Sequence, residues 1–457
     1  MSTPKEEFTV RTTAATQNVL RKIQLQKSLS GYRKKNEIAA AQFSDIEIAK
    51  NRAGAIRHRV IENLDKYLIE FESNFLKNNG VLIWAQDAQE ALKKIEEILQ
   101  LENIQTVIKS KSMVTEEIGL NEFLQQKHID TIETDLGEFI QQLSGEAPYH
   151  IVTPCIHKSK EEVNHILTEK INAPASITAG EMTKLVRLHL KKILAESSAS
   201  VTGANFLIAD SGAIAITENE GNAFYSITVP KIHIAITGIE KIIPSSQDLE
   251  LFWPLLSSFG TGQKMTTYNH LIKGAKQSNE KDGPEKFYLI LLDNGRSDLL
   301  SKTEQRSALA CIRCGACYNV CPVYKNIGGH AYGHVYGGPV GKVIAPHLSK
   351  KKNLDHLSYA STLCGACSEI CPVKIPIHRL LLANREENAK QIAATEKIIW
   401  VAWKKAMLNR KNMDRGGAFA KNSILNLFFK KLWGEEREFP KVAPKSFNQM
   451  MRERMKI

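Results

Sequence analysis

Seven of the eight cysteines fall into two short motifs whose spacing is typical of iron–sulfur ligation. The first motif, CIRCGACYNVCPV at residues 311–323, contains Cys311, Cys314, Cys317 and Cys321. Three thiolates separated by two residues can reach three irons of one [4Fe–4S] cube, while the fourth cysteine binds a second cluster. Disulfide frameworks spread along a chain whereas metal sites cluster, so the motif predicts metal binding, with zinc as the alternative for four sulfurs alone.

The second motif, STLCGACSEICPV at residues 361–373, has one cysteine fewer. Cys364, Cys367 and Cys371 align with the last three cysteines of the first motif, and Ser361 stands in the place of the first. Crossed ligation, as in two-cluster ferredoxins, therefore predicts two sets of cysteine ligands. The first set is Cys311, Cys314, Cys317 and Cys371, and the second is Cys321, Cys364 and Cys367.

The second set is one ligand short, and the sequence leaves three states open. The cluster is a three-iron [3Fe–4S] cluster, or a cube whose fourth iron takes the Ser361 oxygen, water or a partner's ligand, or a cube capped by Cys155 or a histidine. Cys155 ends an apolar strand pattern and is interpreted more simply as a buried, inert thiol. The glycine-rich spacer between the motifs holds the candidate histidines and two tyrosines, for which packing is the simpler explanation: His330, His334, His347, Tyr332 and Tyr336.

The patterns around the motifs divide the chain into four regions. Residues 1–75 are expected to form a helical leader packed on the next domain. Short apolar runs alternate with helical patterns over residues 76–295, which predicts an α/β domain with a largely parallel sheet. Its expected strands include HIVTP, from residue 150, and a hairpin turning at Ser211 and Gly212. Residues 296–388 are predicted to be a helical, ferredoxin-like two-cluster domain, and residues 389–457 a basic helical tail.

An open parallel sheet binds ligands beyond the carboxyl ends of its strands. Lys109, Ser110, Lys111 and Ser112 lie at such an end, where lysines and backbone amides could hold a carboxylate or phosphate. A purely structural helix start, with acidic residues in its first turn, is the alternative. Other polar residues recur at the same predicted edge, which suggests a shared pocket: Asp135, Glu138, His150, His157, Glu218, Glu220, Asn222, Asp293 and Asn294. The sequence contains neither a dinucleotide fingerprint nor a readable nucleophile triad.

The charge of the chain is concentrated in its tail. Residues 389–457 contain 16 Lys and Arg against 6 Asp and Glu, so they carry +10 of the net charge of +12. Without a phosphate loop, zinc-finger spacing or aromatic RNA-binding signature, this favours a partner-facing surface over specific nucleic-acid binding. Amphipathic pieces such as WVAWKKAMLNR suggest peripheral contact with the inner face of the membrane as an alternative. No secretory signal or spanning segment is evident, so we expect a cytoplasmic location.

Taken together, these segments resemble the lactate utilization protein B family. The resemblance covers nearly the whole chain and is carried by the following stretches: KSKSMVTEEIGLN, ETDLGEFIQQLSGE, HIVTPCIHK, TGANFLIADSGAIAITENEGN, KIHIAITGIEKIIPS, LLDNGRS, CIRCGACYNVCPVY, YGGPVGKVIAPHL, STLCGACSEICPVKIPIH and APKSFNQ. It implies an α/β domain of the LUD type, similar to the sugar-phosphate isomerase and CoA-transferase architecture, followed by the two-cluster domain. The second motif of the family is also one cysteine short, so Ser361 agrees with the family pattern.

The resemblance implies an electron-transfer subunit of a complex that oxidises L-lactate to pyruvate and supports growth on lactate. The implied partners are a cysteine-rich iron–sulfur protein, a second LUD-domain protein and a one-electron or quinone-linked acceptor. The implied cofactors are two iron–sulfur clusters, expected as two [4Fe–4S] cubes with the open states given above for the second. Two other functions compete: an enzyme whose incompletely ligated iron acts as a Lewis acid on a hydroxy acid, and a redox-sensing scaffold.

Overall fold

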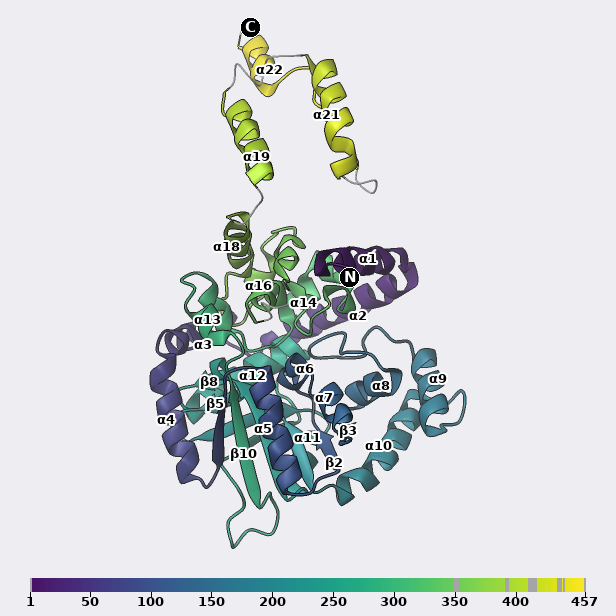
Figure 1. Ribbon diagram of the computed structural model, residues 1–457, viewed down its shortest axis with the longest axis vertical. Coiled ribbons are helices and arrows are strands. Elements are labelled where there is room, and N and C mark those ends of the chain that lie inside the picture. Colours follow the sequence, from purple (N-terminus) through teal and green to yellow (C-terminus); the bar gives the residue numbers. More distant parts are fainter. Residues whose placement is uncertain are drawn as a thin grey trace. The chain divides into compact units, whose positions relative to one another are not determined.

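The computed structural model describes residues 2–348, 353–390, 394–409, 417–433, 438 and 440–455. The chain divides into two compact units, Met1–Glu386 and Glu387–Ile457. The first unit contains two β-sheets and both cysteine motifs, and its helices and strands are labelled in Figure 1.

A six-stranded parallel sheet forms the centre of the first unit, with the order β1-β10-β7-β4-β2-β3. Its strands are β1 (Val81–Ala85), β2 (Thr106–Lys109), β3 (Asp130–Glu133), β4 (Ala199–Thr202), β7 (Ile232–Gly238) and β10 (Lys286–Leu292). Alternate residues of β10 belong to two different hydrophobic cores, with Ile290 on one face and Leu289 and Leu291 on the other. Both faces of the sheet are therefore covered, which explains the nearly continuous apolar runs of its strands.

A second, four-stranded sheet has the order β8-β5-β6-β9. Its strands are β5 (Phe206–Ile208), β6 (Ala213–Glu218), β8 (Ile242–Ile243) and β9 (Tyr268–Ile272). The expected hairpin is present, because β5 and β6 pair antiparallel across Ser211 and Gly212. Gly212 has a φ of +63°, and a side chain there would collide with the backbone of Phe75, so both conformation and space require glycine.

Helices that follow the strands complete the α/β region. They are α5 (Ala88–Leu101), α6 (Met113–Ile118), α7 (Leu120–Gln126), α8 (Leu136–Ser144), α9 (Lys160–Ile171), α10 (Ala179–Glu196), α11 (Asn222–Thr228) and α12 (Leu249–Gly260), with short 3₁₀ turns η1 (Ile239–Lys241) and η2 (Ser246–Asp248). Helix α5 begins at the Asp87 cap and buries Ala91, Ile95 and Ile98 on one face, as its sequence periodicity predicts.

The prediction of a strand at HIVTP is wrong. Residues 149–156 form a buried loop, closed by the Tyr149 amide donating to the Pro154 carbonyl at 2.9 Å. The apolar run is explained by packing against the cysteine segment, because His150 lies edge-on to Tyr318 and Tyr324 at ring distances of 5.3 and 5.8 Å. A buried loop and a short buried strand share the same apolar signature.

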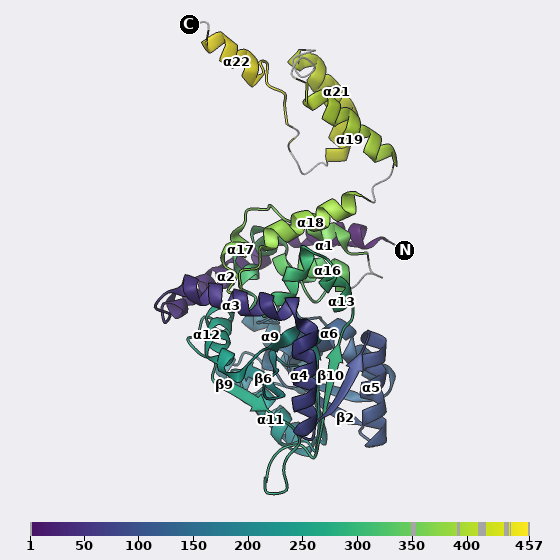
Figure 2. The same ribbon diagram turned by 90° about the vertical axis from the view of Figure 1, so that its left-hand side faces the viewer.

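The helical leader contains four helices, and only its last part packs on the sheets. These helices are α1 (Pro4–Gln17), α2 (Val19–Ala40), α3 (Ile46–Glu62) and α4 (Leu64–Lys77). Helix α4 buries Phe71 and Phe75 against the strands, whereas α1 and α2 lie beside the cysteine-bearing helices (Figures 1 and 2). The Arg11 side chain donates to the Ala331 carbonyl, and the buried Arg57 donates to the Ala310 carbonyl just before the first motif.

The cysteine segment is helical in its described residues, as expected. Its elements are α13 (Arg296–Leu300), η3 (Gln305–Ala310), α14 (Ala316–Val320), α15 (Pro322–Ile327), η4 (His330–Tyr332), α16 (Gly338–Leu348), η6 (Asp355–Tyr359), α17 (Ala366–Glu369) and α18 (Ile377–Ala389). All of its cysteines except the exposed Cys364 belong to or pack against one hydrophobic core with residues of the leader and of β5 and β6, so this segment and the α/β region form a single packed body.

The second unit contains α19 (Ala394–Met407), α21 (Ala418–Trp433) and α22 (Phe447–Arg454), in line with the expected helical tail. Large apolar side chains of its described residues are exposed, including Trp400, Trp403 and Leu427. Throughout the described part of the chain, no helix is both long and apolar enough to cross a membrane.

A buried ion network joins the α/β region to the cysteine segment. The Arg296 guanidinium contacts Glu117 at 2.8 Å and Glu240 at 2.6 Å, and all three side chains are at most 1% exposed. The Tyr336 hydroxyl donates to Glu117 at 2.7 Å, and Arg313 reaches Glu240 at 3.3 Å. Burial alone would raise the pKa of Glu240, but Arg296 and Arg313 lower it to about 2. The network is therefore charged at neutral pH and connects five separate segments of the chain.

Removal of Arg296 should strongly destabilise the protein. In Arg296→Met, Glu117 and Glu240 lose their main partner while remaining buried, so we expect a loss of about 3–5 kcal/mol in the free energy of unfolding, measured by urea denaturation. The control is Arg306→Met, which removes an exposed ion pair with Glu62 and should cost under about 1 kcal/mol. Equal losses in the two variants would contradict a special role for the buried network.

Candidate functional site

The two cysteine motifs repeat one local backbone conformation. The residue before the second cysteine position and the glycine after it have positive φ in both motifs: Arg313 (+60°) and Gly315 (+78°) in the first, Leu363 (+56°) and Gly365 (+83°) in the second. A positive φ is unfavourable for any residue other than glycine. Its recurrence at Arg313 and Leu363 therefore indicates that both motifs need this backbone conformation. The turn wraps the backbone around the space between the thiols.

Ser361 occupies the place of a cysteine in structure as well as in sequence. In the first motif the Arg313 amide donates to the Cys311 sulfur at 3.4 Å. In the second motif the Leu363 amide donates to the Ser361 hydroxyl oxygen at 3.1 Å. The serine oxygen therefore stands in the position of the missing thiolate and is available as an oxygen ligand.

Electrostatic contacts fall mainly within two groups of thiols. Burial raises the pKa of Cys314, and Cys311 and then Cys371 raise it further. Burial, Cys311 and Cys314 raise the pKa of Cys317, with a smaller contribution from Cys367, so the two groups lie close enough to interact. The pKa of Cys367 is raised by burial, Cys321 and Cys364. The first thiol group is Cys311, Cys314, Cys317 and Cys371, and the second thiol group is Cys321, Cys364 and Cys367. The ligand assignment stays a prediction, with which these contacts are compatible.

The separation of the thiols suits a cluster better than a single metal ion. Zinc–sulfur bonds of about 2.3 Å in a tetrahedral site place the sulfurs about 3.8 Å apart. Among the described residues, which include all seven cysteines, no three thiols lie within 4.8 Å of one another. The wider spacing leaves room for a core of irons and sulfides, and the residues present therefore fit iron–sulfur clusters.

A buried lysine faces the second thiol group. Lys342 is 1% exposed, and its ammonium donates to the Cys321 sulfur at 3.8 Å and to the Ala360 carbonyl. Burial lowers the pKa of Lys342, while Cys321 and Cys367 oppose that shift. Cys364 of the same group is exposed, so this group reaches the surface whereas the other thiols are buried or half-buried.

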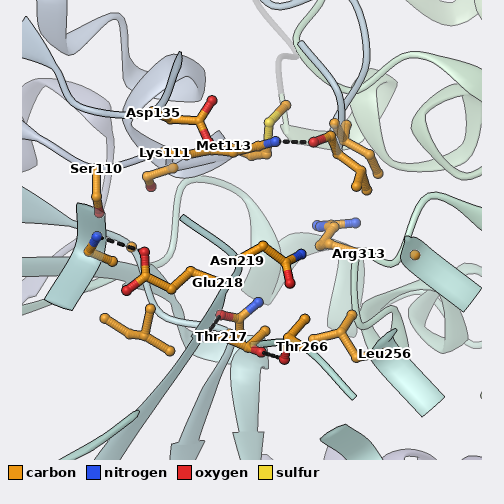
Figure 3. Close-up of a pocket in the computed structure, with 18 of the residues that line it drawn as sticks. Ser110, Lys111, Met113, Asp135, Thr217, Glu218, Asn219, Leu256, Thr266 and Arg313 are labelled. Carbon is orange, nitrogen blue, oxygen red and sulfur yellow. Dashed lines mark hydrogen bonds between the residues drawn. The ribbon is translucent and has the colours of Figure 1, made fainter. Parts of the chain in front are cut away.

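A pocket of about 370 Å³ lies between the sheets and the first thiol group. The lining includes seven of the residues expected at the strand ends: Ser110, Lys111, Ser112, Asp135, Glu218, Glu220 and Asn222. The cysteine segment contributes Arg313, Cys314 and Tyr336. Figure 3 shows Ser110 and Glu218 on one side of this pocket and Arg313 on the other.

Lys109 does not belong to this pocket, and its expected role as an anion ligand is wrong. It is fully buried, with its ammonium 2.6 Å from Glu116, 2.7 Å from Glu133 and 3.0 Å from the Thr115 hydroxyl. These ion pairs use the lysine to join β2 to α6 and β3. Lys109 therefore has a structural role at this strand end, whereas Lys111 lines the pocket.

The remaining strand-end candidates also lie outside the pocket: Glu138, His150, His157, Asp293 and Asn294. Asp293 accepts from the Ser297 amide and hydroxyl at the start of α13, which is a local turn interaction. Asn294 donates to Glu117 of the buried ion network.

The candidate fourth ligands of the second cluster that lie outside the two motifs have other partners. His330 bonds to the Ala147 carbonyl at 2.7 Å, the Tyr336 amide donates to His334, and His347 lies 3.1 Å from the Asn384 side chain. The Cys155 thiol is half-buried rather than buried, and its charged neighbours include Asp135 and Lys111. Burial raises its pKa, and these neighbours belong to the α/β region rather than to the second thiol group.

Sequence analysis missed two cations of the pocket, Lys241 and Arg313. Lys241 follows β7 within an apolar run, and burial followed by the neighbouring Arg313 lowers its pKa to about 7. Arg313 lies between Cys311 and Cys314, and the motif was interpreted only for its cysteines. A usable signal existed for Lys241, because it follows the carboxyl end of a buried strand as Lys111 does.

Comparisons with known proteins agree with this arrangement. The LUD domain family matches residues 68–292, and the 4Fe-4S dicluster domain family matches residues 307–375. Lactate utilization protein B 1 of Bacillus mycoides (strain KBAB4) is 40% identical over 384 residues, covering 84% of this chain and 79% of that protein. The chain belongs to the lactate utilization protein B family. Lactate utilization protein B of Bacillus subtilis (strain 168) is likewise 40% identical, over 76% of this chain and 73% of that protein.

Membership of the lactate utilization protein B family confirms the expected fold class, an α/β region of LUD type followed by a helical ferredoxin-like region. The dicluster match also confirms the expectation of two [4Fe–4S] clusters. Among solved structures, a DUF162 family protein from Deinococcus radiodurans matches 50% of this chain and 98% of its own, at 13% identity and a TM-score of 0.29.

Lys342 should raise the reduction potential of the cluster on the second thiol group, because a buried positive charge favours the more negative, reduced state. We expect Lys342→Met to lower that potential by about 60 mV, the one-electron equivalent of a tenfold change, in a redox titration followed by electron paramagnetic resonance. Lys50→Met is the control, since Lys50 is also buried, at 6% exposed, but lies near Cys371 of the first group. A potential of the second cluster that moves equally in both variants would contradict the assignment.

Ser361 should hold the fourth iron of the second cluster through its oxygen. We expect about eight irons per anaerobically purified chain, and about seven in Ser361→Ala with the signal of an oxidised three-iron cluster. Ser361→Cys should keep eight, because it supplies a thiolate at the same position. Seven irons in the unaltered protein, or eight in the alanine variant, would show that the serine oxygen is not the ligand.

Proposed function

We propose that this chain is an iron–sulfur electron-transfer subunit of a multi-protein system that oxidises L-lactate to pyruvate and supports growth on lactate. Its relatives at about 40% identity are named lactate utilization protein B, which supports a role in lactate utilization. The observation that carries the electron-transfer role is the pair of thiol groups, one beside a pocket and the other reaching the surface at Cys364.

In this proposal the first thiol group holds one [4Fe–4S] cluster, and the second thiol group with the Ser361 oxygen holds the other. When bound, the clusters supply one-electron transfer, which a two-electron oxidation needs if its acceptor takes single electrons. The chain's own residues provide the surroundings that set the potentials. Backbone amides of Arg313, Tyr324 and Ile375 donate to the sulfurs of Cys311, Cys321 and Cys371 at 3.4 Å each.

The surface around Cys364 is the natural docking face for a redox partner in this proposal. Cys364 is exposed, and Tyr359, just before the second motif, is 52% exposed. An exposed cysteine ligand shortens the path to a partner's redox centre, and an exposed aromatic side chain suits a protein interface. By the family resemblance, the partners are a cysteine-rich iron–sulfur protein and a second LUD-domain protein, with a one-electron or quinone-linked acceptor.

The Lewis-acid alternative gains no support from the pocket. A substrate bound there would lie beside Cys314 of the first thiol group, whereas the iron with an incomplete cysteine set belongs to the second. The pocket lining includes no cysteine of the second group. Electron transfer therefore remains the leading function, with a redox-sensing scaffold as the outcome if the clusters prove dispensable.

Loss of a proposed cluster ligand should abolish electron flow. In the reconstituted system, we expect Cys317→Ser to lower the rate of L-lactate-dependent dye reduction on the order of 100-fold, because this buried cysteine is a proposed ligand of the first cluster. Cys155→Ser is the matched control, since this cysteine lies outside both motifs, and it should leave the rate unchanged. Full activity of a Cys317→Ser protein that has lost its first cluster would favour the redox-sensing scaffold as the function.

A further inference from the structure

We propose that the pocket beside the first thiol group binds a small carboxylate of the 2-hydroxy or 2-oxo acid class, with its carboxylate between Lys241 and Arg313. The existence of an anion site follows from the geometry of these two cations. The choice of acid rests in addition on the proposed function in lactate oxidation.

The first argument is that both cations are buried and incompletely paired. The Arg313 side chain is 9% exposed; one of its terminal nitrogens contacts Glu240, but Nε and Nη1 are buried without a hydrogen-bond partner among the described residues. Lys241 is 6% exposed, and no hydrogen bond or ion pair of the described residues involves its ammonium. Unpaired buried donors are costly, so their presence on one pocket wall indicates an anionic ligand.

The second argument is the charge balance of this region. Three buried arginines and Lys241, whose pKa is lowered to about 7, gather here against two buried carboxylates, so at neutral pH this region has between one and two positive charges in excess: Arg57, Arg296 and Arg313 with Lys241, against Glu117 and Glu240. A cluster on the first thiol group would offset this excess from its own side, near Cys311. Arg313 and Lys241 also line the pocket, so they remain accessible to an anion that enters from it.

The third argument is the presence of carboxylates elsewhere in the pocket lining. Asp135 and Glu220 line the pocket as well, and Figure 3 shows Asp135 away from Arg313. A 2-hydroxy acid has an anionic end and a hydroxyl donor, and this pocket offers cations for the first and carboxylates for the second. At about 370 Å³ the pocket exceeds what a three-carbon acid needs, so it selects by charge and donor pattern and admits longer acids of the class.

Cys314 provides a spectroscopic reporter, because it lines the same pocket. An anion bound there adds a negative charge next to a ligand of the first cluster. We expect a saturable change in the electron paramagnetic resonance signal of the reduced first cluster, and no change in that of the second. This readout is independent of lactate turnover.

The test is a titration of the full-length anaerobic holoprotein with pyruvate, L-lactate, acetate and inorganic phosphate, followed by calorimetry and by the first-cluster signal. We expect saturable binding of pyruvate and lactate, at least tenfold weaker in Lys241→Met. Lys231→Met is the matched control, because this exposed lysine precedes the opposite end of β7, and it should bind normally. Met113→Trp, which fills the pocket without changing its charge, should also block binding and covers the case in which the lysine variant fails to fold.

Absence of saturable binding, or binding that neither Lys241→Met nor Met113→Trp weakens, would overturn the proposal. Equal binding of acetate and phosphate would overturn the assignment to the 2-hydroxy and 2-oxo acid class. The reconstituted lactate assay separates the two proposals. Lactate-dependent electron flow without pocket binding would refute only this inference, whereas pocket binding without electron flow would support it and refute the electron-transfer function.

Discussion

Arg296 carries the interaction on which the arrangement of the first unit depends. Its guanidinium lies between Glu117, next to the end of α6, and Glu240, beyond β7, and it belongs to the helix that starts the cysteine segment. Two carboxylates and an arginine removed from water are stable only when their geometry is maintained. The network therefore fixes the strand ends relative to the first motif. The pocket between them is held in shape by the same contacts.

The two motifs share one backbone conformation but lie in different surroundings. The first is enclosed by arginines, tyrosines and the 149–156 loop, and its thiols are mostly buried. The second opens to solvent at Cys364 and has a serine oxygen and Lys342 beside its three thiols. A duplicated turn has thus been placed in two electrostatic environments, which is how similar clusters acquire different potentials.

The sequence predicted features that depend on local patterns. Helix α5 and the hairpin at Gly212 follow from periodicity and turn chemistry, and the cysteine motifs follow from spacing. Features that depend on tertiary partners were missed. Lys109 differs from Lys111 only in which neighbours surround it, Arg313 acquires its role from Glu240 far earlier in the chain, and HIVTP is a loop because aromatic rings of a later segment pack on it.

The packing of the leader on the cysteine segment has a consequence for biosynthesis. Arg57 donates to the carbonyl of Ala310, 253 residues further along the chain, and Leu25 and Leu29 share a core with the cysteines. At ribosomal rates of about 5–20 residues per second, the leader is exposed for roughly 13–50 s before that partner is made. During this interval the apolar face of the leader lacks the partners that the cysteine segment supplies in the folded protein.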